Sequence, residues 1–159
     1  MVDAEKRQHC KALEELWRRL GKVSEFSFTA SNGPGSRTNW RGHGRGTLQL
    51  QQPEGRERQL LFDERAHFTD SEGHTFDLQN RYRWTLLAET LRLEHLRREE
   101  PVLLFELQPV TDHGFREVRP HLCGADTYTA ELLLRKNEIE LIWQIHGPRK
   151  NERLHYHYW

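Results

Sequence analysis

The chain has 159 residues, of which 30% are charged, and 24 Lys and Arg residues balance 24 Asp and Glu residues. This length is typical of one domain with a single core, over residues 1–159, and the zero net charge argues against a nucleic-acid-binding protein, which carries a basic surface. The mean hydropathy of −0.91 indicates a very polar surface, whereas five Trp residues argue against a disordered chain.

Cys10 and Cys123 are the only cysteines, too few for the disulfide framework of a small secreted domain. The first residues carry charges without an apolar segment behind them, so a signal peptide is not expected. No run approaches the roughly 18 apolar residues of a membrane span. We therefore expect a cytoplasmic protein without a membrane span, and its oligomeric state, a homodimer included, stays open.

The first predicted element is a helix over about residues 4–20. Leu13, Leu16, Trp17 and Leu20 recur at helical spacing, and Gly21 follows as the expected residue after the helix end. A helix with one apolar face must pack against something. We expect it to pack on the rest of the domain or cap its mouth, with a partner-binding helix as the alternative.

From about residue 22 to residue 159 the hydrophobic period changes to two. Short alternating segments such as Phe26 to Ala30 and Ile139 to Ile145 are separated by Gly, Pro and Asn turns at near-regular spacing. About nine or ten strands result, without the helical crossovers of a parallel sheet. The predicted fold class is mainly β, an antiparallel up-and-down β-barrel with one N-terminal α-helix. A β-sandwich is the second choice, because closure into a barrel removes exposed sheet edges.

Gly42, Gly44 and Gly46 occupy alternate positions of one predicted strand. They do not form a phosphate-binding loop, because neither a Lys-Ser/Thr pair nor a helical pattern follows them. Alternate glycines instead fit a strongly bent strand, or one that another element approaches closely.

The stretch from His121 to Tyr128 holds a polar cluster on an apolar wall. If Gly124 and Ala125 form a β-bulge, the strand phase flips and His121, Cys123, Asp126 and Tyr128 point the same way. Four uses are open: a metal site, a Cys-His nucleophile pair, a buried hydrogen-bond network, or polar anchors of a ligand pocket. We expect Cys123 to be mostly buried, with Leu122 among its apolar neighbours.

Arg81 and Arg83 alternate with Tyr82 and Trp84 on another predicted strand. The arginines lie on the solvated exterior if the aromatic residues face the core. If the arginines face inwards, they form an anion site in a closed cavity, because guanidinium groups bind carboxylate or phosphate through two hydrogen bonds.

The segment from Gly147 to Lys150 is predicted to be a hairpin turn whose basic tip could attract an anionic ligand. Near the C-terminus His155 and His157 alternate with tyrosines. A barrel histidine could serve as a haem ligand, but with ten histidines in the chain no cofactor is assigned.

Several landmarks together resemble one family. They are Trp40 with the alternate glycines, the Arg81-to-Trp84 strand, His121-x-Cys123-x-x-Asp126-x-Tyr128, Trp143-x-x-x-Gly147-Pro148-x-Lys150, and the Tyr-rich last strand. Their order and spacing are similar to DUF6314, small bacterial proteins of unassigned function. The resemblance covers nearly everything after the helix and implies a lipocalin-like or calycin-like barrel. It implies no activity.

The leading functional hypothesis is a barrel that binds a small hydrophobic or amphipathic ligand without catalysis. Polar groups would hold its head and aromatic residues its body. The candidate ligand-binding residues are His121, Cys123, Asp126, Tyr128, Arg81, Arg83, Trp84, Trp143 and Lys150. The alternatives are an enzyme that uses the His121 to Tyr128 cluster and a protein-interaction module. No catalytic residue and no metal ligand is assigned.

Overall fold

A computed structural model describes residues 2–37, 40–98 and 100–159. Met1, Thr38, Asn39 and Glu99, which the predicted domain includes, lie outside the described residues. The described part of the chain contains one helix and eleven strands, in this order: α1 (Val2–Leu20), β1 (Glu25–Asn32), β2 (Gly42–Gln51), β3 (Gln59–Asp70), β4 (Thr75–Leu86), β5 (Leu91–Leu96), β6 (Pro101–Pro109), β7 (Gly114–Glu117), β8 (His121–Cys123), β9 (Asp126–Leu134), β10 (Ile139–His146) and β11 (Asn151–Tyr158).

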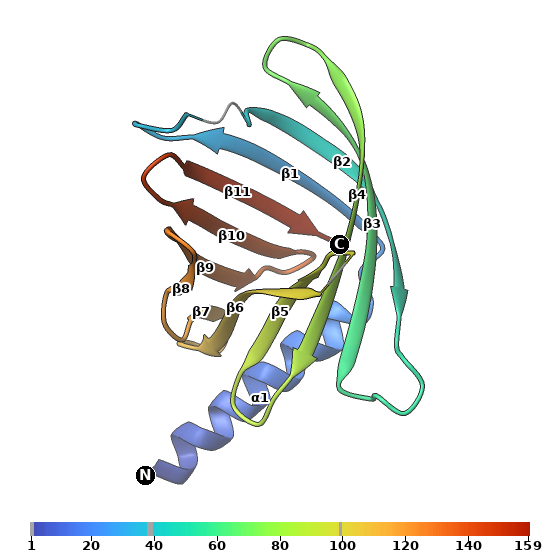
Figure 1. Cartoon of the computed structure of the whole chain (residues 1–159). Coiled ribbons are helices and arrows are strands. Elements are labelled where there is room, and N and C mark those ends of the chain that lie inside the picture. Colours follow the sequence, from blue (N-terminus) through green and yellow to red (C-terminus); the bar gives the residue numbers. More distant parts are fainter. Residues whose placement is uncertain (1, 38–39, 99) are drawn as a thin grey trace.

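The strands form one closed antiparallel barrel (Figure 1). Strands β1 to β7 pair with their neighbours along the chain, β9 joins β7 to β10, and β11 joins β10 to β1. Among the described strands these ten make the wall, while the short β8 pairs only with β9. The predicted mainly β fold, an antiparallel barrel with an N-terminal helix, is confirmed, and the closer likeness to lipocalin or calycin barrels stays a prediction.

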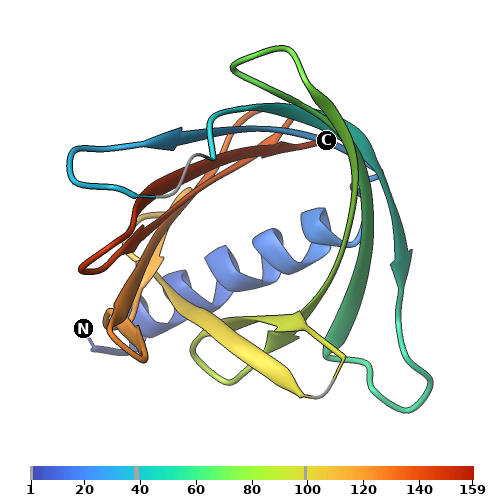
Figure 2. The same cartoon turned by 45° about the horizontal axis from the view of Figure 1, so that its top comes forward.

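Helix α1 crosses one end of the barrel, as the view into the barrel shows (Figure 2). Its apolar face is buried, and Leu16 and Leu20 are fully inaccessible to solvent. Acidic residues in the first turn and Arg18 and Arg19 in the last complement the helix dipole. Arg19 also donates a hydrogen bond to the Glu138 carbonyl at 3.0 Å, which ties the helix to the barrel. Within the described residues, no helix is long and apolar enough to cross a membrane.

The half of the barrel nearest α1 is packed by large side chains. Apart from a bulge in β6, every second residue of the long strands faces inwards, so the strands contribute alternating apolar positions to one core. Over the whole barrel the largest fully buried aromatic side chains are Trp84, Phe26, Phe62, Phe68, Phe105 and Phe115.

The glycines of β2 lie where neighbouring groups approach the strand closely. A Cβ atom on Gly44 would overlap the ring of Phe28, and one on Gly46 would overlap the carbonyl of Arg65. The alternate glycines thus let the adjacent strand and an interior aromatic ring come into contact with the β2 backbone.

Gly124 and Ala125 form a hairpin turn, so the predicted β-bulge is wrong. Cys123 pairs directly with Asp126, which leaves two residues in the loop, and Gly124 has a φ of +64° as the first loop position of a type II′ turn requires. Residues directly opposite each other in antiparallel strands project from the same face. The turn therefore places His121, Cys123, Asp126 and Tyr128 on one face, as the bulge would have done.

We predict that Gly46→Ala destabilises the protein by about 1–3 kcal/mol, because the new methyl group must displace the backbone of Arg65. Gly21→Ala is the matched control. Gly21 follows the helix without a left-handed φ, and a Cβ there would meet its nearest neighbour at an ordinary 3.6 Å. Urea unfolding should show a lower midpoint for Gly46→Ala only, and equal midpoints would contradict the close approach.

Candidate functional site

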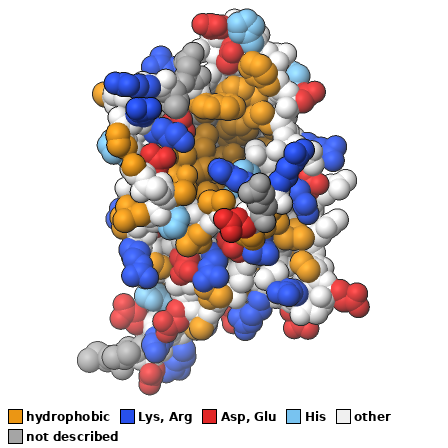
Figure 3. Space-filling view, in the orientation of Figure 1, with side chains coloured by type: hydrophobic (Ala, Val, Ile, Leu, Met, Phe, Trp, Pro, Cys, Tyr) orange, Lys and Arg blue, Asp and Glu red, His pale blue; other side chains and the backbone are white. Residues whose placement is uncertain are grey.

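The end of the barrel opposite α1 is hollow. An open cavity of about 440 Å³ lies there, and the space-filling view shows it as a depression lined by hydrophobic side chains (Figure 3). This volume is within the roughly 300–1,000 Å³ of small-molecule sites. A larger groove of about 580 Å³ lies between α1 and the β6–β7 loop, but it is shallow and most of its lining is polar and exposed.

Aromatic and aliphatic side chains make the wall of this cavity. Trp40 stands at the mouth with 48% of its surface exposed, and its ring lies 5.4 Å from that of Phe68. The ring of Phe28 stacks on Tyr156 at 5.0 Å. The apolar and aromatic lining residues are Phe28, Ala30, Trp40, Leu78, Tyr82, Leu104, Tyr128, Trp143, Ile145, Leu154 and Tyr156.

Three tyrosines and a histidine bring polar atoms into this apolar wall. Tyr156 and Tyr82 lie close enough for each to affect the pKa of the other, and the Tyr82 ring stacks on His95 at 5.0 Å. Burial and the nearby charge of Arg97 lower the pKa of His95, so its ring is neutral at pH 7. A neutral ring nitrogen can accept a hydrogen bond, as the 3.4 Å contact from Arg97 Nε to His95 Nδ1 requires.

Positive charge gathers at the mouth of the cavity. Arg97, Lys150 and Arg153 line it, together with one acid, Glu152. Lys150 comes from the Gly147–Lys150 turn, which the hydrogen bond from the Gly147 N–H to the Lys150 carbonyl closes at 2.8 Å. The Lys150 Nζ atom lies 3.7 Å from Asp126 Oδ2, an ion pair that places the ammonium group beside the opening.

The His121 to Tyr128 cluster reaches the cavity through one member. Tyr128 lines the wall, its hydroxyl contacts Cys123, and the His121 ring packs 5.9 Å from its own. Burial, followed by the contact with Cys123, raises the pKa of Tyr128. Asp126 instead pairs with Lys150. Cys123 is partly buried and packs against the hydrophobic core, although Leu122, expected among its apolar neighbours, is 70% exposed to solvent.

The remaining predicted residues divide between cavity and exterior. Trp143 lines the cavity, whereas Trp84 is buried in the packed half of the barrel. Arg81 is exposed on the outer face, and Arg83 Nε donates to Glu94 Oε1 at 3.0 Å, also outside. The alternative in which both arginines face inwards is therefore wrong, because Tyr82 and Trp84 occupy the inner face of β4.

Glu64 is a polar core residue that the sequence analysis missed. It lies on the inward face of β3 between Phe62 and Ala66 and is only 2% exposed. Tyr158 donates a hydrogen bond to Glu64 Oε2 at 2.7 Å, while among the described atoms Glu64 Oε1 has no partner. A carboxyl at an inward position of an apolar alternation was the available signal.

Burial raises the pKa of Glu64 to about 8, against a smaller lowering by the Tyr158 hydrogen bond. Glu64 is also close enough for its charge to raise the pKa of Tyr82 and Tyr156, which line the cavity. The protonated carboxyl is thus the inner end of a tyrosine network behind the cavity wall.

We predict that the protein loses stability as pH rises from about 4.5 to 8. In this window the folded protein keeps a proton on Glu64 that the unfolded chain releases, so ionisation disfavours the folded state progressively. The loss should be on the order of 5 kcal/mol, and Glu64→Gln, which stays neutral and can still accept from Tyr158, should remove most of it.

Urea unfolding at several pH values measures how the free energy of unfolding falls with pH. Glu106→Gln is the control, because Glu106 is a partly exposed carboxylate that pairs with Arg92 at 3.0 Å. If the free energy of unfolding still falls with pH in Glu64→Gln, another group is responsible and the prediction is wrong.

Of three comparisons with known proteins, one gives a match, and this match covers the whole barrel. No curated protein and no solved structure matches the chain. A family model, described as a family of unknown function (DUF6314), matches residues 25–159, from the first residue of β1 to the C-terminus. The match covers most of the chain and excludes α1. The resemblance seen in the sequence is thereby confirmed, and the chain belongs to the DUF6314 family.

Proposed function

We propose that this barrel binds a small amphipathic molecule with an apolar body and an anionic head. One observation carries the proposal: an open cavity with an aromatic wall has Arg97, Lys150 and Arg153 at its mouth. An apolar body gains free energy by leaving water for such a wall. A carboxylate or phosphate head at the mouth would meet the arginines and the lysine while staying partly hydrated.

The wall also supplies groups for orientation. The hydroxyl groups of Tyr82, Tyr128 and Tyr156 can donate to a polar atom of the ligand, and the neutral His95 ring can accept from one. Among the candidate residues from the sequence, Tyr128, Trp143 and Lys150 belong to this site, and Asp126 acts on it through Lys150.

The two alternative functions have less support. An enzyme built on Cys123 would need a base in hydrogen-bonding contact with the thiol, and within the described contacts the partner of Cys123 is Tyr128 rather than His121. An interaction module acting through α1 would need its apolar face available, yet Leu13, Leu16 and Leu20 are already buried on the barrel.

We predict that dodecanoate binds in the cavity and that filling the cavity weakens its binding. Ala30→Phe places a ring in the space, whereas Thr29→Phe adds the same ring on the outer face of β1. Isothermal titration calorimetry should show at least a roughly tenfold weaker affinity for Ala30→Phe, about 1.4 kcal/mol, and little change for Thr29→Phe. Leu154→Trp is a second filling variant. Equal affinities in all variants, or no saturable binding by the unmodified protein, would contradict the proposal.

We predict that removing positive charge at the mouth weakens the binding of anionic ligands and leaves the binding of uncharged ligands unchanged. The double variant Arg97→Gln/Lys150→Gln should bind dodecanoate roughly tenfold more weakly, because each lost charged contact contributes on the order of 0.5–1.5 kcal/mol at a partly exposed site. Binding of the uncharged dodecan-1-ol should not change. Arg81→Gln, on the outer face, is the control. A double variant that loses both ligands equally would indicate a structural effect rather than recognition of the head.

A further inference from the structure

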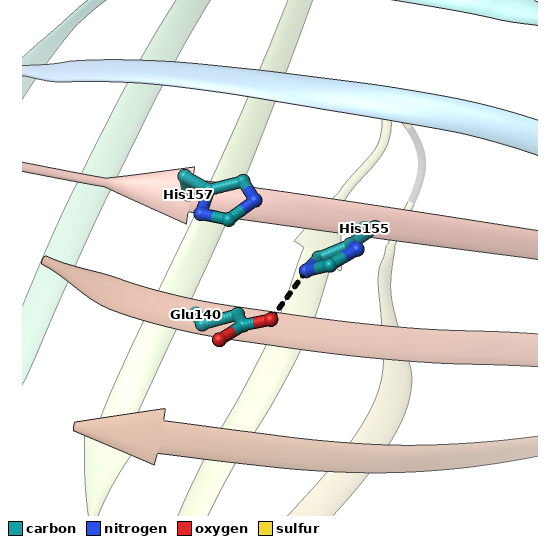
Figure 4. Close-up of side chains that lie close together, drawn as sticks. All are labelled: Glu140, His155 and His157. Carbon is teal, nitrogen blue, oxygen red and sulfur yellow. Dashed lines mark hydrogen bonds and ion pairs between the residues drawn. The ribbon is translucent and has the colours of Figure 1, made fainter. Parts of the chain in front are cut away.

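A second cluster of polar side chains lies on the outer face of the barrel, away from the cavity. Glu140 on β10 and His155 and His157 on β11 each offer one donor atom, and these three atoms lie within 4.8 Å of one another. Figure 4 shows the three side chains close together over the two strands. All three are partly buried, with side-chain exposures of 13%, 28% and 34% respectively.

Strand register brings these donors together. Glu140 pairs directly with His157, and His155 is two residues away on the same strand, so all three project from one face. Tyr156, which lies between the histidines, and Tyr158, which follows them, face the barrel interior. The histidines therefore lie on the opposite side of β11 from the cavity, and neither is available to a haem inside the barrel.

We propose that Glu140, His155 and His157 bind a first-row transition-metal dication, with Zn²⁺ as the ion that fits best. Two imidazoles and one carboxylate form a donor set that zinc commonly takes, and three protein ligands leave a fourth position for water. Ca²⁺ and Mg²⁺ fit less well because they prefer oxygen donors throughout.

Neighbouring charged groups already orient two of the donors. His157 Nδ1 lies 3.1 Å from Glu138 Oε1, so the ring can donate its Nδ1–H to this carboxylate and present Nε2 as a metal ligand. A carboxylate behind a histidine in this way is a common feature of zinc sites, and it makes the imidazole more basic. Arg135 Nε donates to Glu140 Oε2 at 2.9 Å, which leaves Oε1 towards His155.

The ion would replace a proton in an existing contact. Glu140 Oε1 and His155 Nε2 lie 2.7 Å apart and share one hydrogen bond. Binding of the dication requires both as lone-pair donors, so the proton on His155 Nε2 must leave: an imidazolium releases it to solvent, and a neutral ring carries it on Nδ1 instead. The three donors already lie within 4.8 Å of one another, so side-chain adjustments alone bring them to the roughly 2.0–2.2 Å bonds of zinc to nitrogen and carboxylate oxygen.

Another histidine of the outer surface provides a matched control. His67 Nδ1 lies 2.8 Å from Asp77 Oδ1, a contact like that of His155 with Glu140. Among the described residues this pair belongs to no group of three donors. A site that needs three ligands should therefore depend on His155 and not on His67.

The test is titration of the chelator-treated full chain with Zn²⁺ by isothermal titration calorimetry. We expect one saturable site that His155→Asn, His157→Asn and Glu140→Gln each weaken strongly, while His67→Asn leaves it unchanged. Glu138→Gln should weaken it less, by about tenfold, as expected for a residue that orients a ligand. Circular dichroism verifies that each variant keeps the barrel fold.

Co²⁺ provides a second readout that does not depend on affinity. Four-coordinate Co²⁺ should give visible absorption bands that His157→Asn removes and His67→Asn keeps. The proposal is wrong if the three ligand variants bind Zn²⁺ as tightly as the unmodified protein, if His67→Asn lowers the affinity as much as they do, or if the Co²⁺ spectrum is insensitive to His157.

Discussion

The pairing of the first strand with the last is the constraint on which the rest of the structure depends. Phe26 lies opposite Tyr158, and the register continues along both strands to Asn32 and Glu152. Backbone hydrogen bonds between Glu25 and Trp159, at 3.0 and 3.1 Å, extend this closure to the last residue. Closure defines an inside and an outside for every strand. On β11 it sends Tyr156 and Tyr158 to the interior and His155 and His157 to the exterior, so one strand contributes to both proposed sites.

Because α1 covers only one end of the barrel, the two halves of the barrel interior differ. Where α1 covers the end, Leu16 and Leu20 meet a core of large aromatic side chains and the interior is filled. At the other end none of the described residues forms a helix over the strands, and the aromatic residues surround an open cavity. Glu64 lies at the boundary, where Tyr158 satisfies one of its oxygens and the tyrosines of the cavity wall stand nearby. A buried carboxyl that stays protonated costs far less than a buried charge, which is how this position is compatible with folding.

Irregularities in the strands decide which residues reach the cavity. The register between β5 and β6 shifts between Leu93 and Glu94, so both Leu104 and Phe105 are buried although they are adjacent. Without this bulge, Leu103 rather than Leu104 would continue the inward alternation of β6. The Gly124–Ala125 turn likewise sets the position of a residue near the cavity. Strand β9 begins directly after it at Asp126, which forms an ion pair with Lys150.

Local periodicity and turn chemistry were enough to predict the helix up to Leu20, the period-two strands and the turn at Gly147. The closed antiparallel class was predicted because closure removes exposed sheet edges. The sequence could not distinguish a bulge from a two-residue turn at Gly124, since both keep His121 and Tyr128 on one face. The sequence also left open whether Arg81 and Arg83 face the interior or the solvent, because alternation reveals two faces of a strand but not which one is inside. The folded barrel alone reveals which face is inside, that Glu64 is buried, and that Glu140 meets His155. These features depend on barrel closure and on the register between strands, which are set by contacts among residues far apart in the chain.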